Sequence, residues 1–152
     1  MKKAFTLIEI IIVISILLIL LSIGVFSSAM VEDFKIREDV KLIHRDLKNA
    51  RNLAISKKDN SKVKFNNENS YTIICGDISE NREYSEKIKI KFKRKDGNIE
   101  TTRTVEFTKR GVSAYGSSGT IELSTPKKIY EITIEPVTGK VNLKDEKGIY
   151  SY

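Results

Sequence analysis

KKAFTLIEIIIVISILLILL, residues 2–21, is the stretch that decides the architecture of this chain. It places one carboxylate, Glu9, in a run that is otherwise apolar, and Glu9 is the only charged residue from Ala4 to Val31. As a helix that rises about 1.5 Å per residue, a run of this length can cross a bilayer. The sequence therefore predicts a single membrane-spanning helix near the N-terminus.

The charges at the two ends of this run predict its orientation. Lys2 and Lys3 precede it, and Glu32 and Asp33 follow it. Because basic residues favour the cytoplasmic side of a membrane, we expect the N-terminus in the cytoplasm and the rest of the chain outside.

A secretory signal peptide is the obvious alternative. Lys2 and Lys3 would be its basic start, and the small residues at 27–29, SSA, its cleavage site. However, the apolar run is longer than is usual for a signal, and a signal has no use for Glu9. The helical pattern also continues past the supposed cut, where a signal peptide should give way to a loop.

Glu9 needs a cationic partner, because a carboxylate near the centre of a bilayer costs about 2.5–3.5 kcal/mol on insertion scales. No Lys, Arg or His lies elsewhere in the span. The cation must therefore come from another chain, or from a new N-terminus that proteolysis creates.

The segment KKAFTLIEI, residues 2–10, resembles the type IV prepilin motif, which joins a short basic leader and a small residue to Phe-Thr-Leu-Ile-Glu. This resemblance implies that a membrane aspartyl prepilin peptidase cuts between Ala4 and Phe5 and methylates the new amine of Phe5. It also implies that Glu9 pairs with the first-residue amine of a neighbouring subunit during assembly. Such a pair of desolvated charges serves register more than stability.

Two departures from the family pattern stand out. The family usually has Gly before the cleavage site, where this chain has Ala4, so we expect slower processing. The chain also lacks the Pro that major pilins commonly carry inside the helix, which favours a minor pilin.

Beyond the membrane run, the chain continues as an amphipathic helix. Its apolar residues recur at spacings of four and three, on one helical face: Ile36, Val40, Ile43, Leu47, Ala50 and Ala54. We therefore predict a leader at 1–4, one long helix formed by a membrane or filament-core part at 5–27 and an amphipathic part at 28–57, and a globular domain at 58–152.

The globular domain reads as strands separated by turns. We expect strands in KVKF (62–65), SYTIIC (70–75), KIKIKFKR (87–94), TTRTVEF (101–107), TIEL (120–123), YEITIE (130–135) and KVNL (140–143). The segment ISENREYSE (78–86) reads as a polar loop, and KDGN (95–98) as a tight turn between two strands. Because no βαβ alternation is present, the predicted class is α+β, a long N-terminal helix packed on antiparallel β-sheets.

The C-terminal half carries a second resemblance. VEFTKRG (105–111), GTIEL (119–123) and YEITIEPVTGKV (130–141) are similar to segments shared by the type II secretion pseudopilin H and FimT group of minor pilins. The matching residues are Phe107, Gly111, Gly119, Thr120, Leu123, Ile132, Ile134, Thr138, Gly139 and Val141. The resemblance implies the β-sandwich fold of that group.

The sequence shows no pattern of catalytic residues. It has no nucleophile motif, no metal-ligand spacing and no phosphate-binding loop, so we expect no enzyme, no cofactor and no metal site. The single cysteine, Cys75, lies in a predicted strand, and we expect it in the core. The single histidine, His44, lies in a charged helical stretch, and we expect it at the surface.

The best candidate for ligand binding is a strand of alternating lysines. On a strand, one face carries the anion-binding candidates Lys87, Lys89, Lys91, Lys93 and Lys95. With a net charge of +7, such a face favours phosphates, and some FimT-like minor pilins are DNA receptors. A solvated surface that prevents sheet aggregation explains the same pattern.

Together these features predict a minor pilin or pseudopilin of a type IV pilus or type II secretion pseudopilus. Its expected partners are other pilin subunits, the prepilin peptidase and the cytoplasmic membrane, which it leaves for a filament at the cell surface. One alternative is a pilus-associated DNA receptor for natural transformation. Another is an exported, membrane-tethered domain that is not processed before Phe5.

Overall fold

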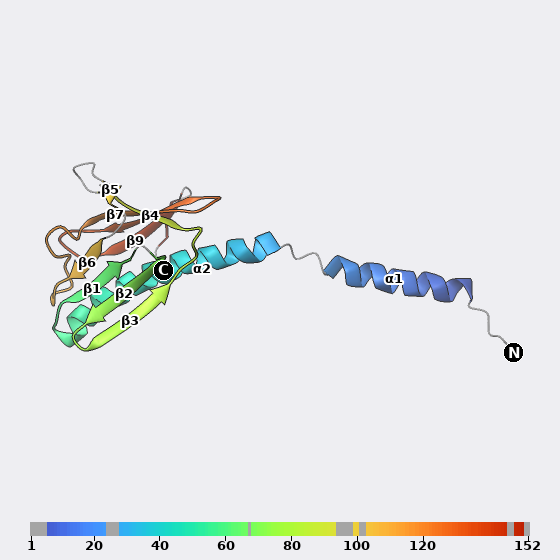
Figure 1. The fold of residues 1–152 in the computed structure, drawn as a ribbon, viewed down its shortest axis with the longest axis horizontal. Coiled ribbons are helices and arrows are strands. Elements are labelled where there is room, and N and C mark those ends of the chain that lie inside the picture. Colours follow the sequence, from blue (N-terminus) through green and yellow to red (C-terminus); the bar gives the residue numbers. More distant parts are fainter. Residues whose placement is uncertain are drawn as a thin grey trace. The chain divides into compact units, whose positions relative to one another are not determined.

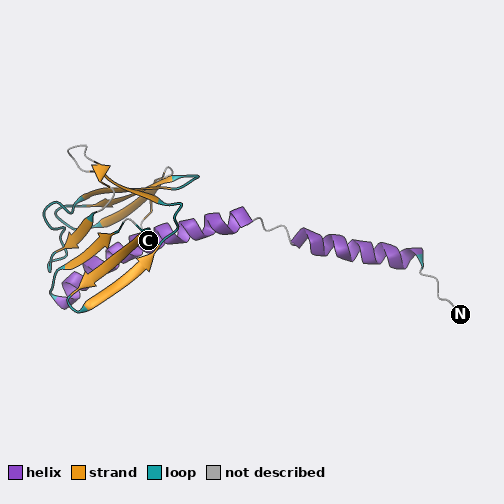
Figure 2. Cartoon of the chain, in the orientation of Figure 1, coloured by secondary structure: helices purple, strands orange, loops and turns teal. Residues whose placement is uncertain are grey.

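The computed structural model describes residues 6–23, 28–66, 68–93, 99–100, 103–145 and 148–150 of the chain. The chain divides into two compact units, residues 1–34 and 35–152. Within the described residues, two helices, α1 (Leu7–Ile23) and α2 (Ser28–Lys57), precede ten strands, and Figures 1 and 2 trace them along the chain. The predicted continuity of one helix from Phe5 to Ser56 stays a prediction, because it runs through residues 24–27, which lie outside the described residues.

Helix α1 is apolar on every side. All its side chains from Leu7 to Leu21 are exposed, and Glu9 lies in its first turn. Ser15 is the one polar, uncharged residue between Leu7 and Leu21, and its hydroxyl donates a hydrogen bond to the carbonyl oxygen of Ile11 at 2.7 Å. Among the described residues, no helix combines the length and apolar character that crossing a membrane requires.

Helix α2 buries the face that its periodicity predicts. The six residues of that face are each 5 % exposed or less: Ile36, Val40, Ile43, Leu47, Ala50 and Ala54. The helix ends at Lys57 because Lys58 adopts the left-handed conformation, with φ at 54°, which turns the chain out of the helix. The prediction of an amphipathic helix over this stretch is confirmed.

The strands form two sheets, and every pairing is antiparallel, as predicted. One sheet has four strands in the order β3-β2-β1-β6, and the other has six in the order β10-β9-β8-β7-β4-β5. The bounds of the first are β3 Ile78–Glu83, β2 Ser70–Cys75, β1 Ser61–Phe65 and β6 Thr104–Phe107. Those of the second are β10 Gly148–Tyr150, β9 Val141–Asp145, β8 Ile129–Ile134, β7 Gly119–Ser124, β4 Lys89–Lys93 and β5 Ile99–Glu100.

The core lies where α2 meets both sheets. Phe65 of β1 packs against Tyr71 of β2 at 5.5 Å between ring centroids, and against Phe92 of β4 at 5.3 Å. Since β4 belongs to the second sheet, this aromatic cluster joins the two sheets. Cys75 is buried in the first sheet, as predicted.

Two predictions about the strands are wrong. Residues 78–83 form β3 instead of a loop, because Gly76, with φ at 56°, allows the chain to turn back and pair along the whole of β2. The strand predicted at 101–107 does not return along β4 after the KDGN turn. The part of it that forms β6 pairs with β1 of the other sheet, and only the two-residue strand β5 pairs with β4. The turn residues 95–98 lie outside the described residues. No pattern in the sequence predicted β10.

Candidate functional site

Glu9 is the charged residue at the start of α1. Its backbone N–H donates to the carbonyl oxygen of Thr6 at 3.1 Å, which places its carboxylate in the first turn, where the helix dipole favours a negative charge. The side chain is exposed. A carboxylate in this position is available to a cation from another chain. Ala4 and Phe5, the predicted cleavage residues, lie outside the described residues.

The lysines of β4 alternate with buried residues, as the sequence predicts. Lys89, Lys91 and Lys93 are exposed, whereas Ile90 and Phe92 point into the core. Of the two remaining candidates, Lys87 is exposed in the turn before β4, and Lys95 lies outside the described residues. Three of the five lysines therefore share one outer face.

That outer face also carries a row of carboxylates that the sequence did not reveal. Lys91 lies opposite Glu122 of β7, Glu122 opposite Glu131 of β8, and Glu131 opposite Lys144 of β9. Lys93 places its Nζ 2.5 Å from Glu122 and 3.9 Å from Glu131. Its hydrogen bond to Glu122 lowers the pKa of that carboxyl and raises the pKa of Lys93. The row offsets much of the positive charge that a phosphate backbone would need.

On one side of the buried stripe, α2 is tied to the first sheet by acidic residues. Asp46 is 4 % exposed and accepts a hydrogen bond from the Tyr71 hydroxyl at 2.7 Å. Arg82 of β3 places its Nε 3.8 Å from the same carboxylate. Burial, followed by the hydrogen bond to Asp46, raises the pKa of Tyr71. Nearer the N-terminus, Asp39 accepts from the backbone N–H of Ser85 at 3.0 Å.

On the other side of the stripe, basic residues tie α2 to the second half of the chain. His44 is 5 % exposed, and its Nε2 lies 3.3 Å from the carbonyl oxygen of Val141 in β9. Arg51 donates from Nε to the carbonyl oxygen of Gly111 at 2.9 Å. The prediction that His44 lies at the surface is therefore wrong, because α2 is covered from two sides and not from one.

Two of the three glycines that matched the minor-pilin resemblance, Gly111 and Gly139, lie close together in space. A Cβ on Gly139, in the turn between β8 and β9, would clash with the carbonyl oxygen of Gly111. A Cβ on Gly111 would lie 2.5 Å from the Cδ1 of Ile55 in α2. Both residues have positive φ, at 63° and 75°. Gly139 therefore requires glycine because of a close backbone approach, and the positive φ of both residues favours glycine.

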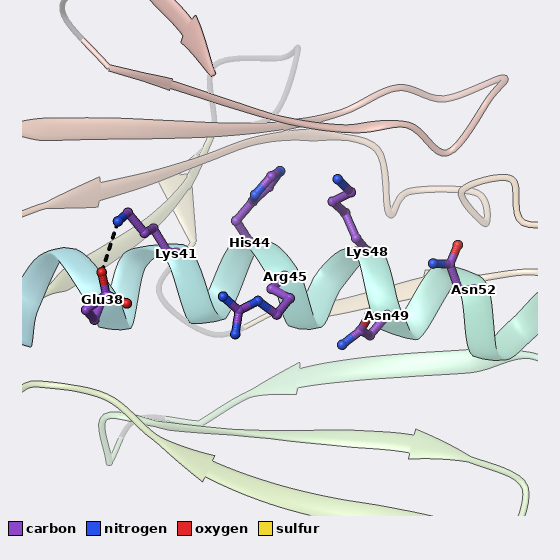
Figure 3. A pocket seen from close by; sticks show the side chains of 7 residues that line it. All are labelled: Glu38, Lys41, His44, Arg45, Lys48, Asn49 and Asn52. Carbon is purple, nitrogen blue, oxygen red and sulfur yellow. Dashed lines mark hydrogen bonds and ion pairs between the residues drawn. The ribbon is translucent and has the colours of Figure 1, made fainter. Parts of the chain in front are cut away.

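The hollow of about 430 Å³ along α2 is lined by that helix alone (Figure 3). Its lining residues are Glu38, Lys41, His44, Arg45, Lys48, Asn49 and Asn52. Strands of the two halves of the domain pass on either side of the helix in this view. Glu38 and Lys41 form an ion pair at 2.9 Å across the lining. The hollow lies along one side of α2, and its lining offers no paired acid and nucleophile.

Comparisons with known proteins bear on these features. Residues 1–25 match the model of the prokaryotic N-terminal methylation motif. The crystal structure of the type IV minor pilin FimU from Pseudomonas aeruginosa matches at a TM-score of 0.59 and 12% sequence identity, over 80% of this chain and 97% of that chain. The chain has the fold of a type IV pilin. No curated protein sequence matches it.

The pilin fold confirms the predicted α+β class, with antiparallel sheets packed on a long helix. The match to the methylation motif confirms the prepilin-like N-terminus that KKAFTLIEI predicts. The narrower resemblance to pseudopilin H and FimT stays a prediction.

Proposed function

We propose that this chain is a minor pilin or pseudopilin, a subunit that a type IV filament system builds into a filament through helix α1. The observation that carries the proposal is the surface of α1. Every one of its described side chains up to Leu21 is exposed, and all but Glu9 and Ser15 are apolar. A helix that is apolar on every side requires lipid or other helices around it.

Glu9 gives this helix its register. In an apolar environment its carboxylate is costly until it meets a cation, and between Thr6 and Ile23 the sequence offers none. Cleavage before Phe5 creates an amine on each subunit. The amine of one subunit then pairs with Glu9 of the next, so that only one axial offset between neighbouring helices neutralises both charges.

Before assembly, the apolar run from Ile10 to Phe26 holds the subunit in the cytoplasmic membrane. Lys2 and Lys3 keep the N-terminus in the cytoplasm, where the leader meets the prepilin peptidase. The folded unit from Lys35 onward lies outside, where the filament grows. This topology is supported by the charge asymmetry of the sequence and by the match to the methylation motif.

Mass spectrometry of the N-terminus tests the processing step on protein taken from its native membrane. An N-methylated Phe5 is the expected terminus. An intact Met1 would show that the chain is a tethered domain that no peptidase processes, and a terminus at Met30 would show a conventional signal peptide.

Assembly is tested separately with Glu9→Gln, which keeps the shape of the side chain and removes its charge. We expect normal cleavage before Phe5 but loss of the protein from sheared filaments, as measured by immunoblot. Glu38→Gln is the matched control, since it removes an exposed carboxylate that pairs with Lys41 in α2. Normal incorporation of the Glu9 variant would overturn the proposed role of this residue.

A further inference from the structure

The outer edge of β3 is an open sheet edge. β3 lies at the end of its sheet, and it bonds to β2 through all six of its residues. Among the described residues, no strand pairs with its other side. Five of its six side chains are exposed, and Ile78 is half-buried. An edge of this length is a template for another strand.

The hairpin geometry shows which backbone groups of β3 face outward. Cys75 and Ile78 close a two-residue turn, and such a closing pair exchanges hydrogen bonds. The backbone N–H of Tyr84 donates to Asn69 at 2.9 Å, in phase with that pattern. Hydrogen-bonded and non-bonded pairs alternate along antiparallel strands. The residues that direct N–H and C=O groups away from the sheet are therefore Ser79, Asn81 and Glu83.

We propose that β3 pairs with the β3 strand of a second copy of this chain, antiparallel and centred on Asn81. In this register the outward residues of one copy face those of the other, as the ladder requires. Within one copy, Arg82 already places its Nη2 2.8 Å from Glu80 Oε2. In the pair, Glu80 also lies opposite Arg82 of the second copy, and Arg82 opposite its Glu80, so the two ion pairs join into one network of four charges. These are non-hydrogen-bonded positions, where facing side chains are closest. The four-stranded sheets of the two copies become one continuous sheet.

Among the registers within two residues of this one, the charges and backbone groups of β3 permit this register alone. A shift of one residue would set outward backbone groups against inward ones. A shift of two residues would set Glu80 against Glu80, or Arg82 against Arg82, and like charges in direct opposition are destabilising. In the centred register the ends also match, because half-buried Ile78 meets half-buried Tyr84 of the other copy. Charges that protect an edge from most strands thus select one partner.

The pairing has a two-fold axis perpendicular to the sheet, and it therefore reverses the direction of α2 in the second copy. Isologous contacts of this kind close on themselves and do not propagate a filament. The α2 helices of the pair point their N-terminal ends in opposite directions. The contact accordingly joins copies that are anchored in different places, and it does not join neighbours within one filament.

A fragment of residues 35–152 tests the pairing, because the whole buried core lies within it. The fragment also excludes the exposed apolar residues Met30, Val31 and Phe34. We expect sedimentation equilibrium to show a monomer–dimer equilibrium between micromolar and millimolar concentration. A monomer at every concentration would overturn the proposal.

Charge reversal then tests the register. Glu80→Arg sets two arginines against each other twice in the pair, and we expect the dimer dissociation constant to rise by about tenfold or more. Arg82→Glu should weaken its own dimer in the same way. An equimolar mixture of the two variants should dimerise as well as the original fragment. In the mixed pair, positions 80 and 82 are both basic in one variant and both acidic in the other, so opposite charges face each other at both contacts.

The matched control is Glu83→Arg, which makes the same change of charge on the same strand. Its side chain lies on the opposite face from Glu80, facing Ser79 of the second copy, so the dissociation constant should stay unchanged. An equal loss of pairing in both variants would overturn the register. Arg82→Glu sets a carboxylate beside buried Asp46, so its fold is checked by circular dichroism. If that variant unfolds, the register is decided by comparing the dimer dissociation constants of Glu80→Arg and Glu83→Arg.

Discussion

At the scale of single residues, polar side chains that flank the buried stripe of α2 fix the helix against the two sheets. With about 100° between successive residues of a helix, Asp46 and His44 lie on opposite sides of that stripe. Asp46 faces Tyr71 of the first sheet, and His44 faces Val141 of the second. Each therefore fixes the helix against a different sheet, while the apolar residues between them fill the core.

The contact between Asp46 and Tyr71 yields a stability prediction. Tyr71→Phe leaves the buried carboxylate with Arg82 alone, and we expect the free energy of unfolding of the 35–152 fragment to fall by about 1.5–3 kcal/mol. Asp46→Ala should cost a similar amount, and the double variant less than the sum of the two. Urea titration measures all three. Tyr115→Phe, at a fully exposed tyrosine, is the matched control and should change nothing.

Neither flanking residue could be predicted as buried from the sequence. A single apolar stripe with charged neighbours is typical of a helix with one covered face, and it indicates nothing about a second sheet. The lone carboxylate Glu9 was different, because an isolated charge in an apolar run is visible without any knowledge of tertiary contacts. The role of Gly111 and Gly139 was visible only as a resemblance, since the close approach between them involves residues 28 positions apart.

At the scale of elements, the alternation of apolar and polar residues predicted the amphipathic strands well, but it did not predict the polar strand β3. β1, β2 and β4 alternate buried and exposed residues, and the sequence located all three. β3 has no apolar face of its own, and its pairing with β2 makes it a strand. Likewise, the lysines of β4 were placed correctly, but their neutralising partners Glu122 and Glu131 come from other strands.

The contact between α2 and β9 yields a prediction of pH dependence. Burial, the largest cause, lowers the pKa of His44 below its usual 6.5, and Lys48 adds to this effect, whereas the bond to Val141 opposes it. The unfolded chain therefore binds a proton at a higher pH than the folded chain does. The contribution of His44 to the free energy of unfolding is fully present above pH 6.5 and declines as the pH falls below that value.

Urea titrations of the 35–152 fragment at a series of pH values measure this decline, with His44→Gln as the comparison. The variant lacks the titrating group, so its free energy of unfolding should stay level as the pH falls from 6.5 toward the range of the carboxylates. The lowered pKa values of Glu122 and Glu135 place their own contribution below pH 4.5, which separates the two effects. Equal pH dependence in both proteins would contradict the assignment to His44.

At the scale of the whole molecule, the two units have different requirements. The core cluster begins at Ile36 and includes residues of α2 and of both sheets. The described side chains of α1 contribute nothing to it, since all are exposed. The folded unit can therefore be complete without α1, whereas α1 needs surroundings that the chain itself does not supply. This division suits a subunit whose folded part is carried by an assembly helix.

Truncation tests that division. Removing residues 1–34 should leave the thermal unfolding midpoint of the remaining unit unchanged, because no buried core residue is lost. Removing residues 1–57 should prevent folding. It would take away Ile36, Val40, Ile43 and Leu47, and burial of each is worth about 1.5–3 kcal/mol, so their sum matches the whole stability of an ordinary domain. Circular dichroism and calorimetry of the two fragments measure this, and a cooperative transition in the shorter one would show that α2 is dispensable to the fold.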